Sequence, residues 1–145
     1  MNPIAHRIRQ ATVAALLSLA AAAASAQVAV IVNPKNSTSS MTADQVSAIF
    51  LGKTSTLPSG ATAAPADQSE SAAIRETFYT KVTGKQSAQV KAAWSRLVFS
   101  GKGTPPKEFA NSAEVKKFVA SNPDAIGYVE KSAVDASVKV VLSVD

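Results

Sequence analysis

Apolar residues recur with two different periods along the chain from residue 28 onward. The segment "VAVIVN" at 28–33 is rich in β-branched residues, and its apolar residues stand at both odd and even positions. This pattern predicts a strand covered on both faces, as in an α/β sheet. The segments "AIGYV" (125–129) and "VKVVLSV" (138–144) predict two closing strands. The segment "ATAAPAD" (61–67) has poor strand propensity, but its place between two predicted helices indicates a further strand.

Four other segments show the helical period, and each has a recognisable start or stop. A capping box at Thr42–Gln45 opens a helix that Gly52 ends. A second helix is predicted at about 70–83 and a third at about 87–99. A fourth helix starts at Asn111 and stops before Pro123. The resulting order predicts an α/β fold, a single small domain with a central mixed sheet flanked by helices. Its predicted aromatic core is one cluster of Phe50, Phe78, Trp94, Phe118 and Tyr128.

The first 26 residues have the composition of a signal peptide. Arg7 and Arg9 precede a short apolar run that ends in "ASA" at 24–26, a small-x-small cleavage pattern. We therefore expect residues 1–26 to be removed, residues 27–145 to form the single domain, and the product to be periplasmic. No later stretch is apolar enough to cross a membrane.

Composition restricts the chemistry. The chain has no cysteine, and its one histidine, His6, lies in the predicted signal peptide. Thiol chemistry, histidine ligation of metals and serine–histidine catalysis are thereby excluded, so we expect neither an enzyme nor a cofactor or metal site. The formal charge is +5, but the basic residues are scattered. This pattern favours a mild attraction for small anions and not nucleic-acid binding.

The segment "ADQSESAAIRETFY" (66–79) is the candidate site, and two interpretations are open. A helix N-terminus offers unpaired N–H groups and partial positive charge, a natural seat for phosphate or sulfate. The alternative is a capped helix, in which Ser69 or Asp67 is the cap and Arg75 is solvated. Glu70 favours the alternative, because it would repel an anion. The candidate ligand-binding residues are Ser69, Ser71, Ala72, Ala73 and Arg75. The Gly-rich "GKGTPP" (101–106) follows a helix instead of opening one, so it is interpreted as a turn.

Several segments together resemble the PstS-like substrate-binding proteins of phosphate ABC transporters. These are "VIVNP" (30–34), "IFLGK" (49–53), the Ser-rich helix start (69–78) and "AIGYVE" (125–130), in this order. Small exported one-lobe relatives also carry a segment like "AWSRLVFSGKGTPP" (93–106). The resemblance covers most of residues 27–145. It implies one lobe of a type II periplasmic binding protein, with phosphate held at the Ser-rich helix start.

The sequence also departs from the family pattern. Where the family has Ser-Gly-Thr, this chain has Ser71-Ala72-Ala73, which removes a close backbone approach and a hydroxyl. Leu57 stands where a tryptophan is expected, and the resemblance begins at the crossover strand, so we expect the first lobe with its anion loop to be absent.

Two functions therefore stay open. The first is a periplasmic solute-binding-like protein that recognises phosphate or a similar oxyanion, weakly or with a partner. The second is an envelope interaction module that has kept the fold without the ligand. The expected partners are the anion and either another envelope protein or a second copy of the chain.

Overall fold

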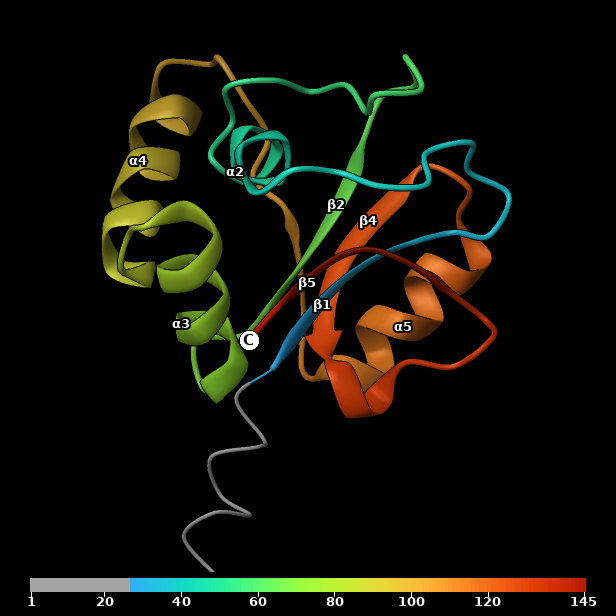
Figure 1. The fold of residues 1–145 in the computed structure, drawn as a ribbon. Helices are drawn as coiled ribbons and strands as arrows, with labels where there is room; N and C mark the ends of the chain where they lie inside the picture. The colour runs from blue at the N-terminus through green and yellow to red at the C-terminus, as the bar shows by residue number, and fades with distance from the viewer. Residues whose placement is uncertain (1–26) are drawn as a thin grey trace, which may run out of the picture.

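The computed structural model describes residues 27–145, and the predicted signal peptide lies outside the described residues. The described part is a three-layer α/β domain (Figure 1). A five-stranded sheet has the strand order β3-β2-β4-β1-β5. The elements are β1 (Val28–Val32), α2 (Ala43–Phe50), β2 (Ala64–Gln68), α3 (Ala73–Phe78), a π-helical turn η2 (Tyr79–Thr83), α4 (Ser87–Phe99), β3 (Lys107–Phe109), α5 (Ser112–Ser121), β4 (Ala125–Glu130), a 3-10 turn η3 (Lys131–Ala133) and β5 (Lys139–Val144).

The sheet is mixed. β1 runs antiparallel to both of its neighbours, β4 and β5. β2 runs parallel to β3 and β4. The predicted α/β class and mixed sheet are thus confirmed. Each of the five residues of β1 is buried. This is expected for a strand that is apolar at both its odd and its even positions.

Each face of the sheet has its own apolar core. Val28, Val30 and Val32 point into the larger core, below α2, α3 and α4. Ala29 and Ile31 point into the smaller core, below α5. Figure 1 shows α5 apart from the other helices, across the sheet. The sheet must therefore be apolar on both sides, which is the reason for the unbroken apolar run in β1.

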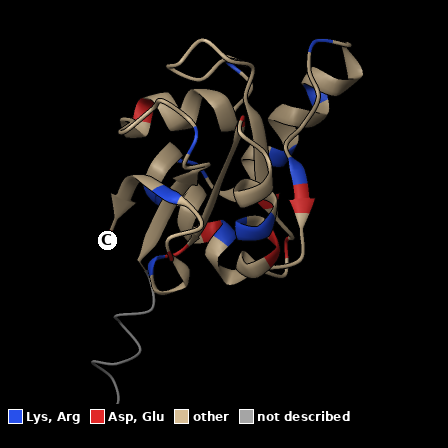
Figure 2. Ribbon diagram, turned by 90° about the vertical axis from the view of Figure 1, so that its right-hand side faces the viewer, with Lys and Arg blue, Asp and Glu red and all other residues tan. Residues whose placement is uncertain are grey.

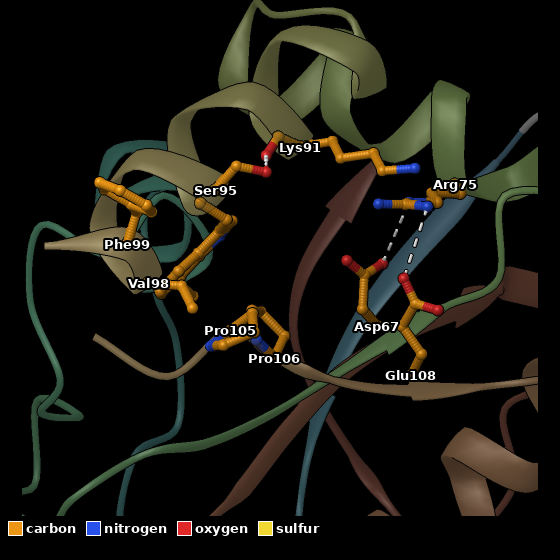
Figure 3. A pocket seen from close by; sticks show the side chains of 10 residues that line it. Asp67, Arg75, Lys91, Ser95, Val98, Phe99, Pro105, Pro106 and Glu108 are labelled. Atoms are coloured by element: carbon orange, nitrogen blue, oxygen red, sulfur yellow. Dashed lines mark hydrogen bonds and ion pairs between the residues drawn. The ribbon is translucent and has the colours of Figure 1, made fainter. Parts of the chain in front are cut away.

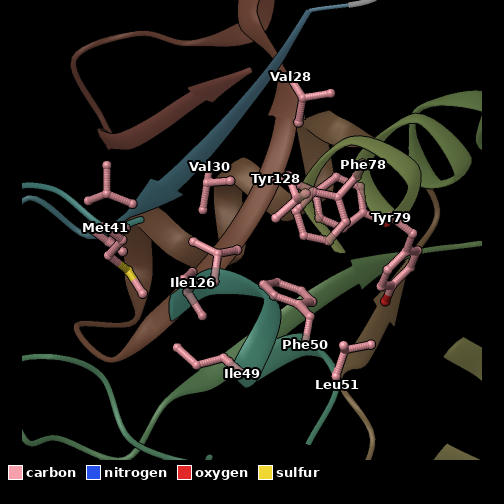
Figure 4. Close-up of a cluster of buried hydrophobic side chains, with 14 of the residues drawn as sticks. Val28, Val30, Met41, Ile49, Phe50, Leu51, Phe78, Tyr79, Ile126 and Tyr128 are labelled. Atoms are coloured by element: carbon pink, nitrogen blue, oxygen red, sulfur yellow. The ribbon is translucent and has the colours of Figure 1, made fainter. Parts of the chain in front are cut away.

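The aromatic core is built mainly on the larger side (Figure 4). The rings of Phe78 and Tyr128 stack with centroids 3.9 Å apart, and Phe50 meets Phe78 edge-on at 4.9 Å. Trp94 packs against the same cluster. The prediction that Phe118 joins them is wrong, because Phe118 packs in the smaller core with Phe109. The period of α5 shows which residues are buried, but not which face of the sheet they cover.

The segment predicted as one helix at 70–83 is divided in the structure. α3 begins only at Ala73, and from Tyr79 the chain continues as the π-helical turn to Gly84, whose φ is +71°. The short strand β3 was not predicted. It is polar, with no apolar alternation, and it forms because Ala66, Asp67 and Gln68 of β2 pair with it.

Basic and acidic positions are interspersed over the ribbon (Figure 2). Among the described residues, no helix has the length and apolar character needed to cross a membrane.

Replacing Phe78 by Ala tests the larger core. Phe78 is fully buried, whereas Phe99 at the end of α4 is 96% exposed. We expect Phe78→Ala to lower the free energy of unfolding by about 3–5 kcal/mol. The matched Phe99→Ala variant should change it by no more than about 0.5 kcal/mol. Urea denaturation of both variants measures the difference, and equal midpoints would contradict this packing.

Candidate binding cleft

A cleft of about 420 Å³ opens between α4 and the strands β2 and β3 (Figure 3). α4 forms one wall, and the segment leading into β3 forms another. The end of β2, the first turn of α3 and β3 provide charged side chains at one end. The lining residues are Asp67, Arg75, Lys91, Trp94, Ser95, Val98, Phe99, Pro105, Pro106 and Glu108.

Arg75 is the cation at the charged end of the cleft, and it is only 5% exposed. Its Nε lies 3.7 Å from Oδ1 of Asp67, and its Nη1 lies 3.7 Å from Oε1 of Glu108. These are ion-pair distances, longer than a charge-assisted hydrogen bond. Nε and Nη1 of Arg75 are both buried without a hydrogen-bond acceptor. Burial opposes the charge on Arg75, but Asp67 and neighbouring groups outweigh it, so the pKa of Arg75 is raised.

Asp67 is the anion that holds Arg75 in place. It lies near the end of β2 and is buried. The hydroxyls of Tyr79 and Tyr128 each donate a hydrogen bond to its carboxylate, and the amide of Gln68 donates another at 2.8 Å. The Arg75 guanidinium also lies over the Tyr79 ring, 5.7 Å from its centroid. Both oxygens of Asp67 are therefore engaged by the protein itself.

The rim of the charged end carries more exposed groups. Lys91 on α4 forms an ion pair with Glu70, and Glu70 lies 4.0 Å from Nη1 of Arg75. The pairing with Lys91 lowers the pKa of Glu70. The Glu108 side chain is 57% exposed, so it can turn toward or away from the cleft.

The rest of the cleft is apolar. The Trp94 indole donates a 2.7 Å hydrogen bond to the carbonyl of Phe50, which fixes α4 against the end of α2. Gly52 allows this contact, since a Cβ there would lie 2.9 Å from the Trp94 ring. Val98 on α4 is 49% exposed. With Phe99 and the two prolines of 105–106 it forms the apolar wall (Figure 3).

The structure brings only one of the five predicted ligand-binding residues, Arg75, into this cleft. The hydroxyls of Ser69 and Ser71 lie 2.8 Å apart and hydrogen-bond to each other. The amide of Ala72 donates to the carbonyl of Ser69 at 2.9 Å, so a turn uses this predicted anion donor. Ala73 is the first residue of α3 and is exposed.

The capped-helix interpretation is corrected in both of its details. The residue at the N-cap position is Ala72, and no side chain caps the helix. Ser69 continues the β2–β3 pairing, with its amide donating to the carbonyl of Phe109. Asp67 is directed into the core, and Arg75 is buried instead of solvated.

Sequence reasoning missed Glu108, Lys91 and the apolar wall. Glu108 lies in the unpredicted strand β3, and Lys91 lies on a helix separate from the Ser-rich segment. The segment 101–106, interpreted as a turn, provides Pro105 and Pro106 to the wall. Within residues 27–145, no cluster of three or more acidic, histidine or cysteine residues is arranged to hold a metal ion.

No protein-family model matches the sequence, and a search of curated proteins finds no significant match. Solved structures do match in fold. A putative phosphate ABC transporter substrate-binding protein with bound phosphate from Clostridium perfringens has a TM-score of 0.65 at 23% identity, over 79% of this chain and 43% of that one. An ABC-type phosphate transport receptor from Vibrio cholerae has a TM-score of 0.64 at 19% identity, over 79% and 44%. PstS from Borrelia burgdorferi has a TM-score of 0.60 at 12% identity, over 79% and 46%.

These similarities show a shared fold. The matched part is less than half of each of the three solved chains, while it is most of this one. The small α/β domain therefore has the fold of a part of these phosphate-binding proteins, in agreement with the resemblance seen in the sequence. At these identities the likeness extends to architecture and not to individual binding residues.

The two tyrosines around Asp67 lead to a prediction about the stability of the fold at alkaline pH. They are the only tyrosines of the chain. Burial, together with the nearby Asp67 carboxylate, raises the pKa of both far above the ordinary value of 10.0. Below pH 10 both are protonated in the folded and unfolded states, and their full contribution to the stability of the fold is present. Above pH 10 the unfolded tyrosines ionise, so stability falls as pH rises.

We expect the ultraviolet absorbance of tyrosinate to appear only as the protein unfolds, together with the change in Trp94 fluorescence. Free tyrosine in the same buffer is the control. A tyrosinate signal that rises near pH 10 while Trp94 fluorescence stays native would contradict the buried cluster.

Proposed function

We propose that this domain is a periplasmic, non-enzymatic solute-binding protein that recognises phosphate or a similar oxyanion through Arg75, weakly or together with a partner. The observation that carries the proposal is the Arg75 guanidinium. It is buried at the end of an open cleft, and two of its nitrogens have no hydrogen-bond acceptor. The fold shared with phosphate-binding proteins supports the same class of ligand.

A buried donor without an acceptor costs about 1–3 kcal/mol, and more when the group is charged. An oxyanion relieves this cost, because its oxygens accept two parallel hydrogen bonds from a guanidinium. Lys91 would add a second positive charge from α4. Because these nitrogens are buried, Glu108 has to move away from Nη1 before a ligand can supply the missing acceptors.

The carboxylates around Arg75 limit the affinity. Asp67, Glu70 and Glu108 all lie within 4.0 Å of the guanidinium nitrogens, so its charge is already largely balanced. A free energy near 4 kcal/mol corresponds to roughly millimolar binding, and micromolar binding needs about 8 kcal/mol. We infer millimolar affinity for phosphate in the isolated domain. A second surface, from another envelope protein or a second copy, would be needed for tight binding.

A second candidate function is an interaction module without a small ligand. The observation that favours it is the exposed pair Val98 and Phe99 at the end of α4, of which Phe99 is 96% exposed. A large apolar side chain left in solvent is typical of a contact site for another protein.

Phosphate titration followed by NMR tests the first candidate against the second. We expect the NMR signals of the amides of residues 67–75 and of Glu108 to shift, with a midpoint at millimolar phosphate. Arg75→Lys keeps the charge but removes the two-pronged hydrogen bonding, so it should weaken binding about tenfold. The matched variant Arg96→Lys changes an exposed arginine on α4 and should leave the midpoint unchanged. Glu70→Gln removes a carboxylate 4.0 Å from Arg75 and should tighten binding.

Two outcomes would contradict oxyanion recognition at Arg75. One is the absence of any shift up to tens of millimolar phosphate, about tenfold above the expected midpoint. The other is an Arg75→Lys variant that binds phosphate like the native protein. The first outcome would leave the interaction module as the better function.

A further inference from the structure

The ionisable side chains that line the cleft are balanced in sign. Arg75 and Lys91 are positive, and Asp67 and Glu108 are negative. They gather at one end, and Figure 3 shows the carboxylates of Asp67 and Glu108 facing the Arg75 guanidinium, with the Lys91 amine on its other side. With Glu70 on the rim, a ligand that carries negative charge alone meets three carboxylates and two cations there. A ligand that carries one positive and one negative group would find an oppositely charged side chain for each of them.

The opposite end of the cleft offers no charge. Trp94, Val98, Phe99 and Pro105–Pro106 form a continuous apolar wall from α4 to the start of β3. A phosphate ion would leave this wall in water. A few polar groups that fix orientation, beside a larger apolar surface, are the usual composition of a site for an organic small molecule.

We propose that the cleft binds a small zwitterion with a large apolar side chain, that is, an α-amino acid of the phenylalanine or leucine type. This inference rests on the proposed function, in that Arg75 is again the cation that recognises the anionic group. It names a ligand class that fits the whole cleft instead of its charged end alone.

The carboxylate of the ligand is assigned to Arg75, whose Nε and Nη1 have no hydrogen-bond acceptor. Glu108 then has to release its 3.7 Å ion pair with Nη1. It can do so, because its side chain is 57% exposed. Once released, Glu108 is the acceptor for the ligand's ammonium group.

Asp67 is assigned a positioning role. Its two oxygens already accept hydrogen bonds from Tyr79 and Tyr128, so it is not available to the ammonium group. It keeps the Arg75 side chain at the end of the cleft. The apolar side chain of the ligand lies along the wall, against Trp94 and Val98.

The cleft contains the only tryptophan of the chain, so binding can be followed by Trp94 fluorescence and by NMR. L-phenylalanine is the full probe. Three further probes each lack one feature: 3-phenylpropionate lacks the ammonium group, 2-phenylethylamine lacks the carboxylate, and glycine lacks the apolar side chain. We expect each of the three to bind at least about tenfold more weakly than L-phenylalanine.

Glu108→Gln separates the role of the ammonium group from general effects on the fold. Because Glu108 is exposed, the variant should fold. It should weaken L-phenylalanine about tenfold, and it should tighten 3-phenylpropionate, because a carboxylate 3.7 Å from Nη1 of Arg75 is removed. Asp124→Asn, which changes an exposed acid just before β4, is the matched control and should change neither.

The outcomes distinguish this inference from the proposed function. If L-phenylalanine and 3-phenylpropionate bind equally, or if Glu108→Gln weakens both equally, the zwitterion is overturned. If phosphate shifts the Arg75 region and L-phenylalanine does not, the oxyanion function stands and this inference falls. If L-phenylalanine binds and phosphate does not, the inference stands and the oxyanion is rejected. If neither binds, both are overturned.

Discussion

The buried carboxylate of Asp67 is the interaction on which the rest of this structure depends. It connects β2, which carries it, to Tyr128 of β4, to Tyr79 of η2 and to Arg75 of α3. A charge taken out of water costs several kcal/mol unless hydrogen bonds and an opposite charge replace the solvent. Two hydroxyls, one amide and a guanidinium provide that replacement here. Removing one partner of such a group typically costs about 3–5 kcal/mol.

The cleft follows from this arrangement. Because Asp67 needs a counter-charge in the core, Arg75 is drawn inward from a short helix that no side chain caps. Asp67 lies beside Nε of the guanidinium, and Glu70 and Glu108 lie beside Nη1, so Arg75 is placed at the charged end of the space below α4. The Trp94 hydrogen bond to the carbonyl of Phe50 fixes α4 at the far side of that space. A structural ion pair and a helix anchor thus leave a cavity that is charged at one end and apolar at the other.

Sequence reasoning predicted the features that depend on neighbouring residues. The unbroken apolar run of β1 predicted a central strand, and the Thr42–Gln45 capping box is present at the start of α2. Asn111 likewise accepts a hydrogen bond from the amide of Glu114. These signals are local, because a cap needs only the next turn and a covered strand needs only its own side chains.

The features that were missed depend on residues distant in sequence. The capped-helix interpretation left Arg75 solvated, whereas the residue is buried beside Asp67 of another element. β3 has no apolar pattern and exists through its pairing with β2. Phe118 was correctly predicted to face inward from α5, but the face of the sheet it covers depends on where the chain crosses.

The position of β1 at the centre of the antiparallel part of the sheet affects how the chain folds. Its two neighbours both come from the last part of the sequence, and Val28 is opposite Val144. Within the described sheet, β1 therefore has no partner until residues 125–144 are available. Contacts between such distant segments slow folding. Until they form, a β-branched segment with no charge is exposed and prone to associate with other chains.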